Sequence, residues 1–312
     1  MKAIAYLIGF AALLLAQSAL ARTLEAGQGK AFPAPSAAIA AAQPGDTVAI
    51  YPGQYFDCAV VLKDNVTIQG VGKAEDVVLT DKACEGKALL VTRAANITVK
   101  NLTLQRARVP DENGAGIRGE GPGLVVDTVR FINNQDGILA GDLPGTMTIR
   151  NSYFEKNGAC EQSCAHGVYV GRMDKLRIEN TVFRETKRAH HIKSRARETE
   201  VVNCDIQDGP NGTASYEIEL PNGGGLLVSG TTIVKGPNAE NHTAAIIIGD
   251  EQIDQPTPKI VISNNTFRND MEFPTVFVKN MTATPAELSG NKISGRSPVR
   301  PLQGEGQVTG AH

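Results

Sequence analysis

Five short segments of the chain carry charged and aromatic residues at one repeated spacing. The segments align on a single apolar residue, which is Ile117, Ile138, Val168, Ile192 or Ile218. If each segment is a strand with this residue turned inward, the next residue faces outward, because side chains alternate along a strand. From segment to segment, that outward position reads Arg118, Leu139, Tyr169, Lys193 and Glu219. Stacked strands lie about 4.8 Å apart, so the last three residues are expected to form one column.

The positions beside this column extend the charged patch. The residue before the inward one is, in turn, Gly116, Gly137, Gly167, His191 and Glu217. If these positions also face outward, the glycines leave a floor without side chains next to a charged coil. Arg195 and the basic stretch RETKRAHHIKSRARE add local positive charge to a chain whose net charge is −2. Any one such residue more often belongs to a solvated strand face, but together they favour a groove that binds an anionic polymer.

These residue types fit one reaction on an acidic sugar. To remove the C5 proton of a uronate, an enzyme must neutralise its carboxylate, take the proton with a base and protonate the leaving oxygen. We predict Lys193 as the base, Tyr169 or His191 as the proton donor, and Arg195 as a substrate clamp. The further substrate-binding residues that we expect are Arg118, Arg172, His166, His190, Glu217 and Glu219.

Glu217 and Glu219 allow two more interpretations. Together they could hold Ca²⁺ against the substrate carboxylate, since Ca²⁺ prefers carboxylate oxygens. Their side chains would be rooted about 6–7 Å apart on one face of a strand. That spacing also permits an acid and base pair for glycoside hydrolysis.

A loose repeat runs through most of the chain. Apolar and polar residues alternate around a polar corner in NLTLQR at Asn101, NSYFEKNG at Asn151, NTVFRET at Asn180, NCDIQDG at Asn203 and NNTFRND at Asn264. A second short strand follows each unit, and no room is left for a crossover helix. Such strands cannot bury a face alone, whereas stacked coils share one core. We therefore predict an all-β parallel β-helix of about eight coils, in preference to a sandwich or a propeller.

The N-terminal part supplies a cover for the stack. The segment SAAIAAAQPGDTVAIYPGQY predicts a short capping helix that ends at Pro44-Gly45 and is followed by a strand. This opening, with the asparagine-cornered coils, resembles the pectin-lyase-like right-handed parallel β-helix superfamily. The resemblance implies the fold, and it leaves the activity open among lyases, epimerases, hydrolases and phage tailspikes.

A second, local resemblance concerns the chemistry. The stretch HHIKSRARETEVVNCDI is similar to the lysine-bearing strand of polysaccharide lyases of the alginate-lyase and chondroitinase-B type. This resemblance implies that Lys193 is the base and that acidic residues hold calcium. One coil later the chain has Glu217 and Glu219 where those enzymes have an arginine. The strands HGVYVGR and HHIKSR also resemble those of alginate C5-epimerases, although the Asp-Pro-His signature of that group is absent.

The N-terminus predicts export. A lysine, a short apolar run and Ala19-Leu20-Ala21 indicate a signal peptide over residues 1–21, and no later stretch is long enough to span a membrane. We expect a β-helix domain over 22–296 and a flexible tail over 297–312, in the periplasm or outside the cell. Five cysteines in that compartment suggest bridges between Cys58 and Cys84 and between Cys160 and Cys164, with Cys204 buried.

The expected partner is thus an anionic polysaccharide. A net charge of −2 gives no bulk attraction to nucleic acid. The leading hypothesis is a lyase that cleaves a uronate polymer by β-elimination, with Ca²⁺ as a possible cofactor. The alternatives are a C5-epimerase, a non-catalytic β-helix that binds or exports polysaccharide, and a glycoside hydrolase.

Overall fold

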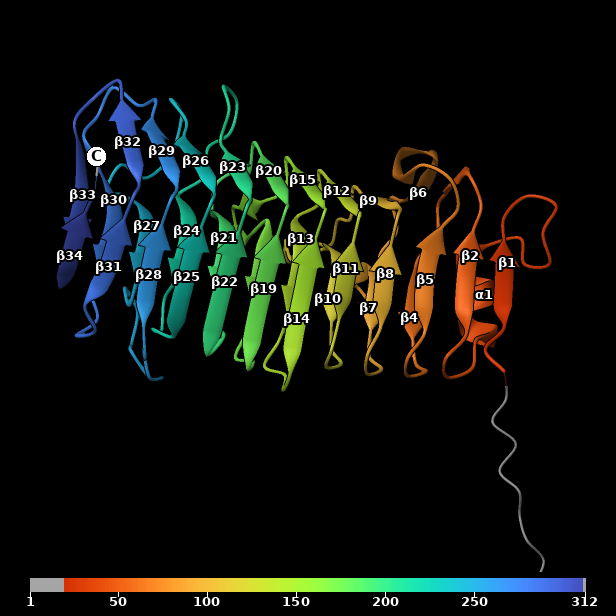
Figure 1. Cartoon of the computed structure of the whole chain (residues 1–312). Helices are drawn as coiled ribbons and strands as arrows, with labels where there is room; N and C mark the ends of the chain where they lie inside the picture. Colours follow the sequence, from red (N-terminus) through yellow and green to blue (C-terminus); the bar gives the residue numbers. More distant parts are fainter. Residues whose placement is uncertain (1–19, 311–312) are drawn as a thin grey trace, which may run out of the picture.

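The structure, a computed structural model, describes residues 20–310. The predicted signal peptide lies almost entirely outside the described residues, so its cleavage stays a prediction. Within residues 20–310, no helix has the length and apolar character that a membrane span requires. The described chain winds into a parallel β-helix, as the repeat predicts, and Figure 1 shows its strands stacked side by side from the N-terminal to the C-terminal end.

Three parallel sheets, here called A, B and C, form the walls of the coil. Sheet A contains β1 (Thr23–Ala26), β2 (Thr47–Ile50), β5 (Thr67–Gly70), β8 (Thr98–Lys100), β11 (Val125–Asp127), β14 (Thr146–Arg150), β19 (Lys175–Glu179), β22 (Glu198–Val202), β25 (Gly225–Ser229), β28 (Ile260–Ser263), β31 (Ala286–Ser289) and β34 (Gly306–Thr309). Sheet B contains β3 (Gly53–Tyr55), β6 (Val77–Thr80), β9 (Thr103–Gln105), β12 (Arg130–Ile132), β15 (Tyr153–Glu155), β20 (Val182–Arg184), β23 (Asp205–Gln207), β26 (Thr232–Lys235), β29 (Thr266–Asn269) and β32 (Lys292–Gly295). Sheet C contains β4 (Ala59–Val61), β7 (Ala88–Thr92), β10 (Ala115–Gly119), β13 (Asp136–Ala140), β18 (Val168–Val170), β21 (His190–Ser194), β24 (Tyr216–Leu220), β27 (Ala244–Ile248), β30 (Thr275–Asn280) and β33 (Val299–Gln303).

The number of coils was underestimated. Sheet A has 12 strands and the other two sheets have 10 each, which gives about 11 turns where eight were expected. The predicted flexible tail is also corrected, because β33 pairs with β30 and β34 pairs with β31. Residues 299–309 therefore close the stack.

The corners explain the asparagine repeat. Between sheets A and B, Asn101, Asn151, Asn180, Asn203 and Asn264 all have φ between 49° and 56°. Asparagine tolerates this left-handed conformation better than other non-glycine residues. The chain can therefore turn at each corner without a longer loop, and loops elsewhere do not disturb the stack.

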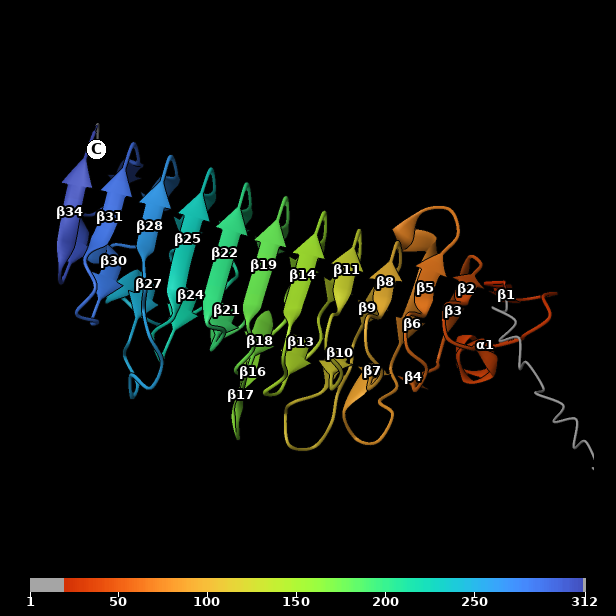
Figure 2. The same ribbon diagram turned by 60° about the horizontal axis from the view of Figure 1, so that its bottom comes forward.

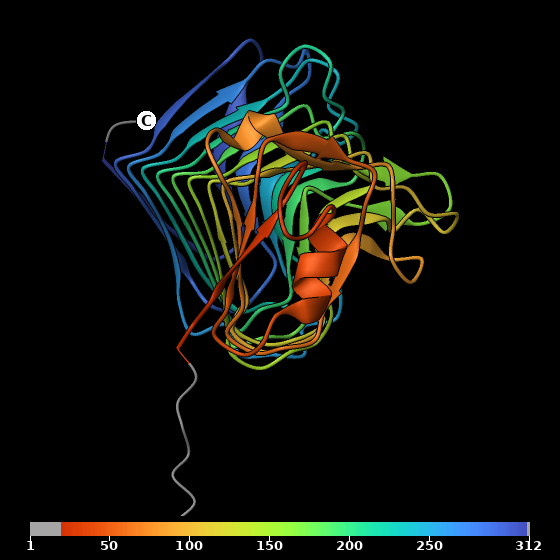
Figure 3. The same cartoon turned by 90° about the vertical axis from the view of Figure 1, so that its right-hand side faces the viewer.

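The N-terminal end is closed by the predicted helix. Helix α1 (Pro35–Ala41) buries Ala38 and Ile39 and packs against β1, β2 and β4. Figure 3, which looks along the axis, shows α1 lying across the coil. A single-turn 3-10 helix, η1 (Ala74–Asp76), precedes β6.

Long connections from sheet B to sheet C project from the coil. One carries the antiparallel pair β16 (Ala159–Cys160) and β17 (Cys164–Ala165), visible with its neighbours in Figure 2. The backbone amides of Glu161 and Gln162 donate to Glu112 of the connection between β9 and β10, two coils earlier, at 2.8 and 2.7 Å. Disulfides join Cys58 to Cys84 and Cys160 to Cys164, and Cys204 is a buried free thiol, as predicted. These connections stand along one side of sheet C.

Candidate active site on sheet C

The predicted outward column exists on sheet C. Strand pairing sets Arg118 beside Leu139, Leu139 beside Tyr169, Tyr169 beside Lys193 and Lys193 beside Glu219. The five inward residues used for the alignment are all fully buried. The register deduced from the sequence is therefore confirmed, and it places Tyr169, Lys193 and Glu219 in adjacent coils.

The position before each inward residue faces the interior, which corrects the predicted glycine floor. A Cβ atom added at Gly116 would lie 2.7 Å from the ring of Phe131, and one at Gly137 would lie 2.8 Å from Phe154. Strand pairing passes over this position, from Ala115 to Ile117 in β10 and from His190 to Ile192 in β21, and two successive residues point inward there. The glycines make room for a stack of Phe131, Phe154 and Phe183, whose ring centroids are 4.4 and 4.6 Å apart.

His191 stands at the same inward position and is fully buried, so it is removed from the predicted catalytic set. The rings of His191 and Phe183 meet edge-on, with their centroids 6.1 Å apart. On the next strand of sheet B, Ile206 takes the position that Phe183 occupies on β20. The two ring nitrogens of His191 contact Thr186 at 2.7 Å and Asp208 at 2.9 Å. His191 therefore fills and connects the core instead of contacting a ligand.

Glu217 is buried beside the same cluster, which corrects its predicted role in substrate and metal binding. Its carboxylate lies 3.5 Å from the ammonium of Lys235, and both side chains are fully buried. Burial, together with the charge of Asp208, raises the pKa of Glu217 well above its usual range. His191, Asp208 and Glu217 each offer one ligand atom within 4.8 Å, but the Lys235 ammonium already supplies the positive charge there.

Lys193 is held by carboxylates on the outward face. Its ammonium lies 2.9 Å from Glu219 and 3.0 Å from Glu251. Burial alone would lower the pKa of Lys193, but the two carboxylates outweigh it and raise the pKa. Burial alone would raise the pKa of Glu219, yet His190 and Lys193 lower it to about 2. Lys193 is thus an ammonium ion at neutral pH.

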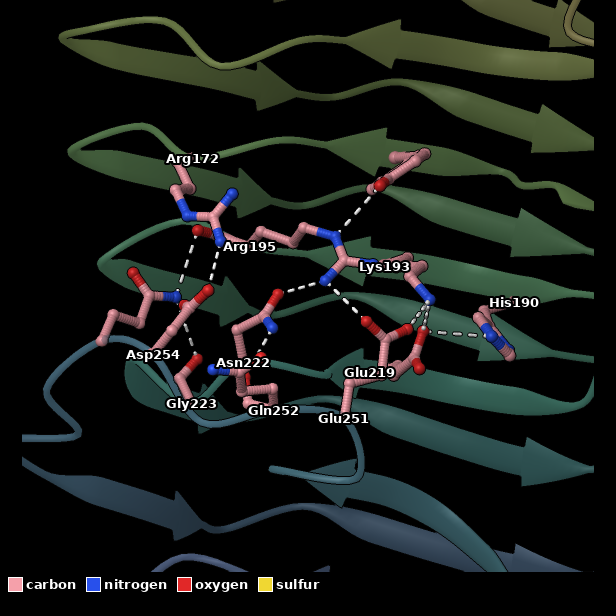
Figure 4. Close-up of polar contacts among 12 residues, drawn as sticks. Arg172, His190, Lys193, Arg195, Glu219, Asn222, Gly223, Glu251, Gln252 and Asp254 are labelled. Carbon is pink, nitrogen blue, oxygen red and sulfur yellow. Dashed lines mark hydrogen bonds and ion pairs between the residues drawn. The ribbon is translucent and has the colours of Figure 1, made fainter.

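Arg195 connects Tyr169 with Glu251. Figure 4 shows Arg195 beside Lys193, Glu219 and Glu251. The Nε of Arg195 donates to the Tyr169 hydroxyl at 3.0 Å, and its Nη1 lies 2.8 Å from Glu251. Arg195 also donates to Asn222. An arginine donor on a phenol oxygen stabilises negative charge on that oxygen.

A loop from two coils further on completes the site. Residues 249–258 connect β27 with β28, and Glu251 of this loop bridges Lys193 and Arg195. Gln255 donates to the carbonyl oxygen of Arg195 at 3.1 Å, and Asn222 donates to that of Gln252 at 2.7 Å. The loop therefore borders sheet C at the end where its strands lead to sheet A, whereas the projecting connections from sheet B border the opposite end.

His166 and His190 form a ladder beside the column. The backbone amide of His190 donates to Nδ1 of His166, and that of Tyr216 donates to Nδ1 of His190, each at 3.2 Å. Nδ1 accepts in both rings, so Nε2 carries the proton and, in His190, points at Glu219 at 3.1 Å. Burial lowers the pKa of His166 well below its usual value. His166 is only 3 % exposed, so it supports the ring of Tyr169 instead of binding substrate as predicted.

The comparisons with known proteins bear on the fold. The family model described as "Right handed beta helix region" matches residues 144–307, just over half of the chain. The chain belongs to the right-handed β-helix family. An alginate lyase from Paenibacillus sp. superposes with a TM-score of 0.68 and 17 % identity over 91 % of this chain and 99 % of that one. Pectate lyase Pel9A superposes with a TM-score of 0.52 and 13 % identity over 92 % and 77 %. No curated protein sequence matches the chain.

On this right-handed β-helix, the two other arginines predicted to bind substrate lie away from Lys193. Arg118 is two coils before Tyr169 in the column, with Leu139 between them. Arg172 lies at the corner toward sheet A, where it pairs with Asp254 and, at 3.5 Å, with Asp142. Both can contact only parts of a ligand that extend beyond the central cluster.

The predicted calcium pair does not fit a metal site. Glu217 faces Lys235 in the interior, whereas Glu219 faces Lys193 and His190 on the outside. The two carboxylates do not converge, and each already has a cationic or hydrogen-bond-donating neighbour. Because Glu217 and Glu219 lie on opposite sides of the strand, they also cannot act together as the predicted acid and base pair for glycoside hydrolysis.

Sequence reasoning missed the residues contributed by the 249–258 loop. Glu251 is far from Lys193 along the chain, and Asp250 lies beside Glu219, where burial and the charge of Glu219 raise the pKa of Asp250. The one available signal was three acidic residues within the ten-residue segment GDEQIDQPTP. The path of the loop back over β21 was not visible in that pattern.

Proposed function

We propose that the chain is a polysaccharide lyase that cleaves a uronate-containing anionic polymer by β-elimination. The observation that supports this most is the place of Glu251, whose carboxylate lies 3.0 Å from Lys193 and 2.8 Å from Arg195. Two cations that bind one carboxylate, next to the Tyr169 hydroxyl, match what a uronate requires. A substrate carboxylate in this place would be neutralised, and its C5 hydrogen would come close to Tyr169.

The structure changes the roles that we give to the column. Lys193 was predicted as the base, but carboxylates hold it as an ammonium ion. We assign proton abstraction to the phenolate form of Tyr169, which Arg195 stabilises by donating to the phenol oxygen, and this oxygen takes the C5 proton. The C5–H electron pair forms the C4=C5 double bond, the C4–O bond breaks, and Lys193 gives a proton to the leaving oxygen.

His190, Glu219 and Asn222 act as positioning residues. His190 and Lys193 share the Glu219 carboxylate, and Asn222 holds the guanidinium of Arg195. The groups that act on substrate are thereby fixed before it binds, which lowers the cost of reaching the transition state.

An exported location is consistent with the proposed lyase activity. The predicted signal peptide and two disulfides are typical of an oxidising compartment. An exported protein would meet polysaccharides of the kind proposed, in the periplasm or outside the cell. We therefore keep the periplasmic or extracellular location as part of the proposal.

A screen of polymers tests the proposal. The purified protein is incubated with alginate, pectate and glycosaminoglycans, with Ca²⁺ and with EDTA, while the absorbance of unsaturated uronate ends is followed. We expect absorbance to rise with at least one polymer and not to rise with Lys193→Ala. Proton exchange at C5 without new chain ends would instead indicate an epimerase, and binding without either change would indicate a non-catalytic protein.

A further inference from the structure

The outward column of sheet C continues beyond the candidate active site. Strand pairing sets Glu219 beside Ile247, Ile247 beside Lys279 and Lys279 beside Gln303. Lys279 is therefore three coils from Lys193, a separation of roughly 14 Å along the axis. Ile247 is 1 % exposed, so no charged side chain stands in the column between Glu219 and Lys279.

A pocket of about 520 Å³ opens around Lys279. It is lined by His242, Lys279, Arg300 and Gln303, together with Thr243 and Pro274 and four further residues, none of which is acidic. Arg300 is oriented by a hydrogen bond of 2.8 Å from its Nε to the carbonyl oxygen of Leu302. His242 stacks on Phe273 with ring centroids 4.3 Å apart, which fixes the imidazole at the edge of the pocket.

The charges of this pocket differ from those around Lys193 in one respect. Lys193 and Arg195 are both compensated by Glu251. Within residues 20–310, Lys279 and Arg300 form no ion pair with a carboxylate at 4.0 Å or less. Two cations without counter-charge, on the same face and in line with the site, give a local positive field that attracts anions.

We propose that this pocket is a second anion-binding subsite, which binds a carboxylate of the same polymer several sugar units from the bond that is cleaved. The inference rests on the proposed function for the identity of the polymer. The polymer would then lie along the axis of the coil on sheet C, between the 249–258 loop and the connections from sheet B. Long chains would reach both places, whereas a disaccharide held at Lys193 would not reach Lys279.

Binding of oligosaccharides of two lengths tests the subsite without relying on turnover. Affinities of alginate and pectate hexasaccharides and disaccharides are measured by calorimetry for the wild type and for Lys279→Ala/Arg300→Ala. The matched control is Lys63→Ala/Lys292→Ala, which removes two exposed charges elsewhere on the coil. We expect the subsite variant to bind hexasaccharide about tenfold more weakly, with a smaller dependence on salt, and the control to be nearly unchanged.

The outcomes separate this inference from the proposed function. Weaker hexasaccharide binding by the subsite variant, in a wild type that shows no turnover, would keep the subsite and reject the lyase. Equal hexasaccharide affinity in the wild type and the subsite variant would overturn the subsite. An equal loss with the disaccharide would also overturn it, as would a wild type that binds neither hexasaccharide.

Discussion

The ammonium of Lys193 and the carboxylate of Glu219 lie 2.9 Å apart on adjacent strands of sheet C, with only 11 % and 4 % of their side chains exposed. Because burial disfavours a charged ammonium, Lys193 depends on its carboxylate partners to keep its proton, and Glu219 contributes more than Glu251. The Glu219 carboxylate is itself held ionised by His190 and Lys193, which lower its pKa to about 2. Glu219 on β24 thereby helps to keep Lys193 on the neighbouring strand β21 in the protonated form that the proposed mechanism requires.

Replacing Glu219 by glutamine should shift the alkaline limb of the pH profile. Without the carboxylate, burial lowers the pKa of Lys193, so the ammonium is lost at lower pH than in the wild type. The profile of kcat/KM against pH measures this shift. Glu200→Gln is the matched control, because Glu200 is also a mostly buried carboxylate paired with a lysine, but on sheet A. An alkaline limb that does not move would contradict the role of Lys193.

Replacing Glu251 by glutamine should tighten substrate binding. The Glu251 carboxylate stands where we place the substrate carboxylate, so its removal leaves Lys193 and Arg195 with less internal compensation. We expect KM for a uronate oligosaccharide to fall several-fold and its dependence on salt to become steeper. A higher KM would show that Glu251 supports the site instead of competing with the substrate.

The buried Lys235 should be essential for stability. Replacing it by methionine leaves Glu217 in the core without its paired ammonium, which is expected to cost about 3–5 kcal/mol in the free energy of unfolding. Denaturant unfolding measures the loss. The double variant Lys235→Met/Glu217→Leu removes both partners and should recover much of it. If the double variant were as unstable as the single one, the pair would not be the cause.

Much of the fold could be predicted from the sequence because its signals are local. The asparagine corners need a left-handed conformation, and apolar residues alternate along each strand, so the register of sheet C follows from the pattern alone. His191 and Glu217 were misplaced because strict alternation fails at the position that strand pairing passes over, just before the inward isoleucine. Glu251 was missed because its contact with Lys193 depends on the path of a loop, and no local pattern encodes that path.

Asp136 should make the protein less stable as pH rises. Burial raises the pKa of its carboxyl to about 8, while its value in the unfolded chain is near 3.9. The stabilising contribution is therefore complete below about pH 4 and is lost as pH rises toward about 8. Asp136→Asn keeps an oxygen that can accept from the His166 amide. We expect this variant to show a flatter dependence of Tm on pH, and a dependence as steep as that of the wild type would contradict the account.

The most direct test of the account is the rate of unsaturated uronate formation by Tyr169→Phe, with oligosaccharide affinity measured on the same sample. The variant removes only the hydroxyl that Arg195 contacts. We predict that affinity stays within a few-fold of the wild type while the rate falls by about 10²–10⁴, the contribution of a general base. A variant that forms unsaturated ends at the wild-type rate would contradict the central claim that Tyr169 removes the proton.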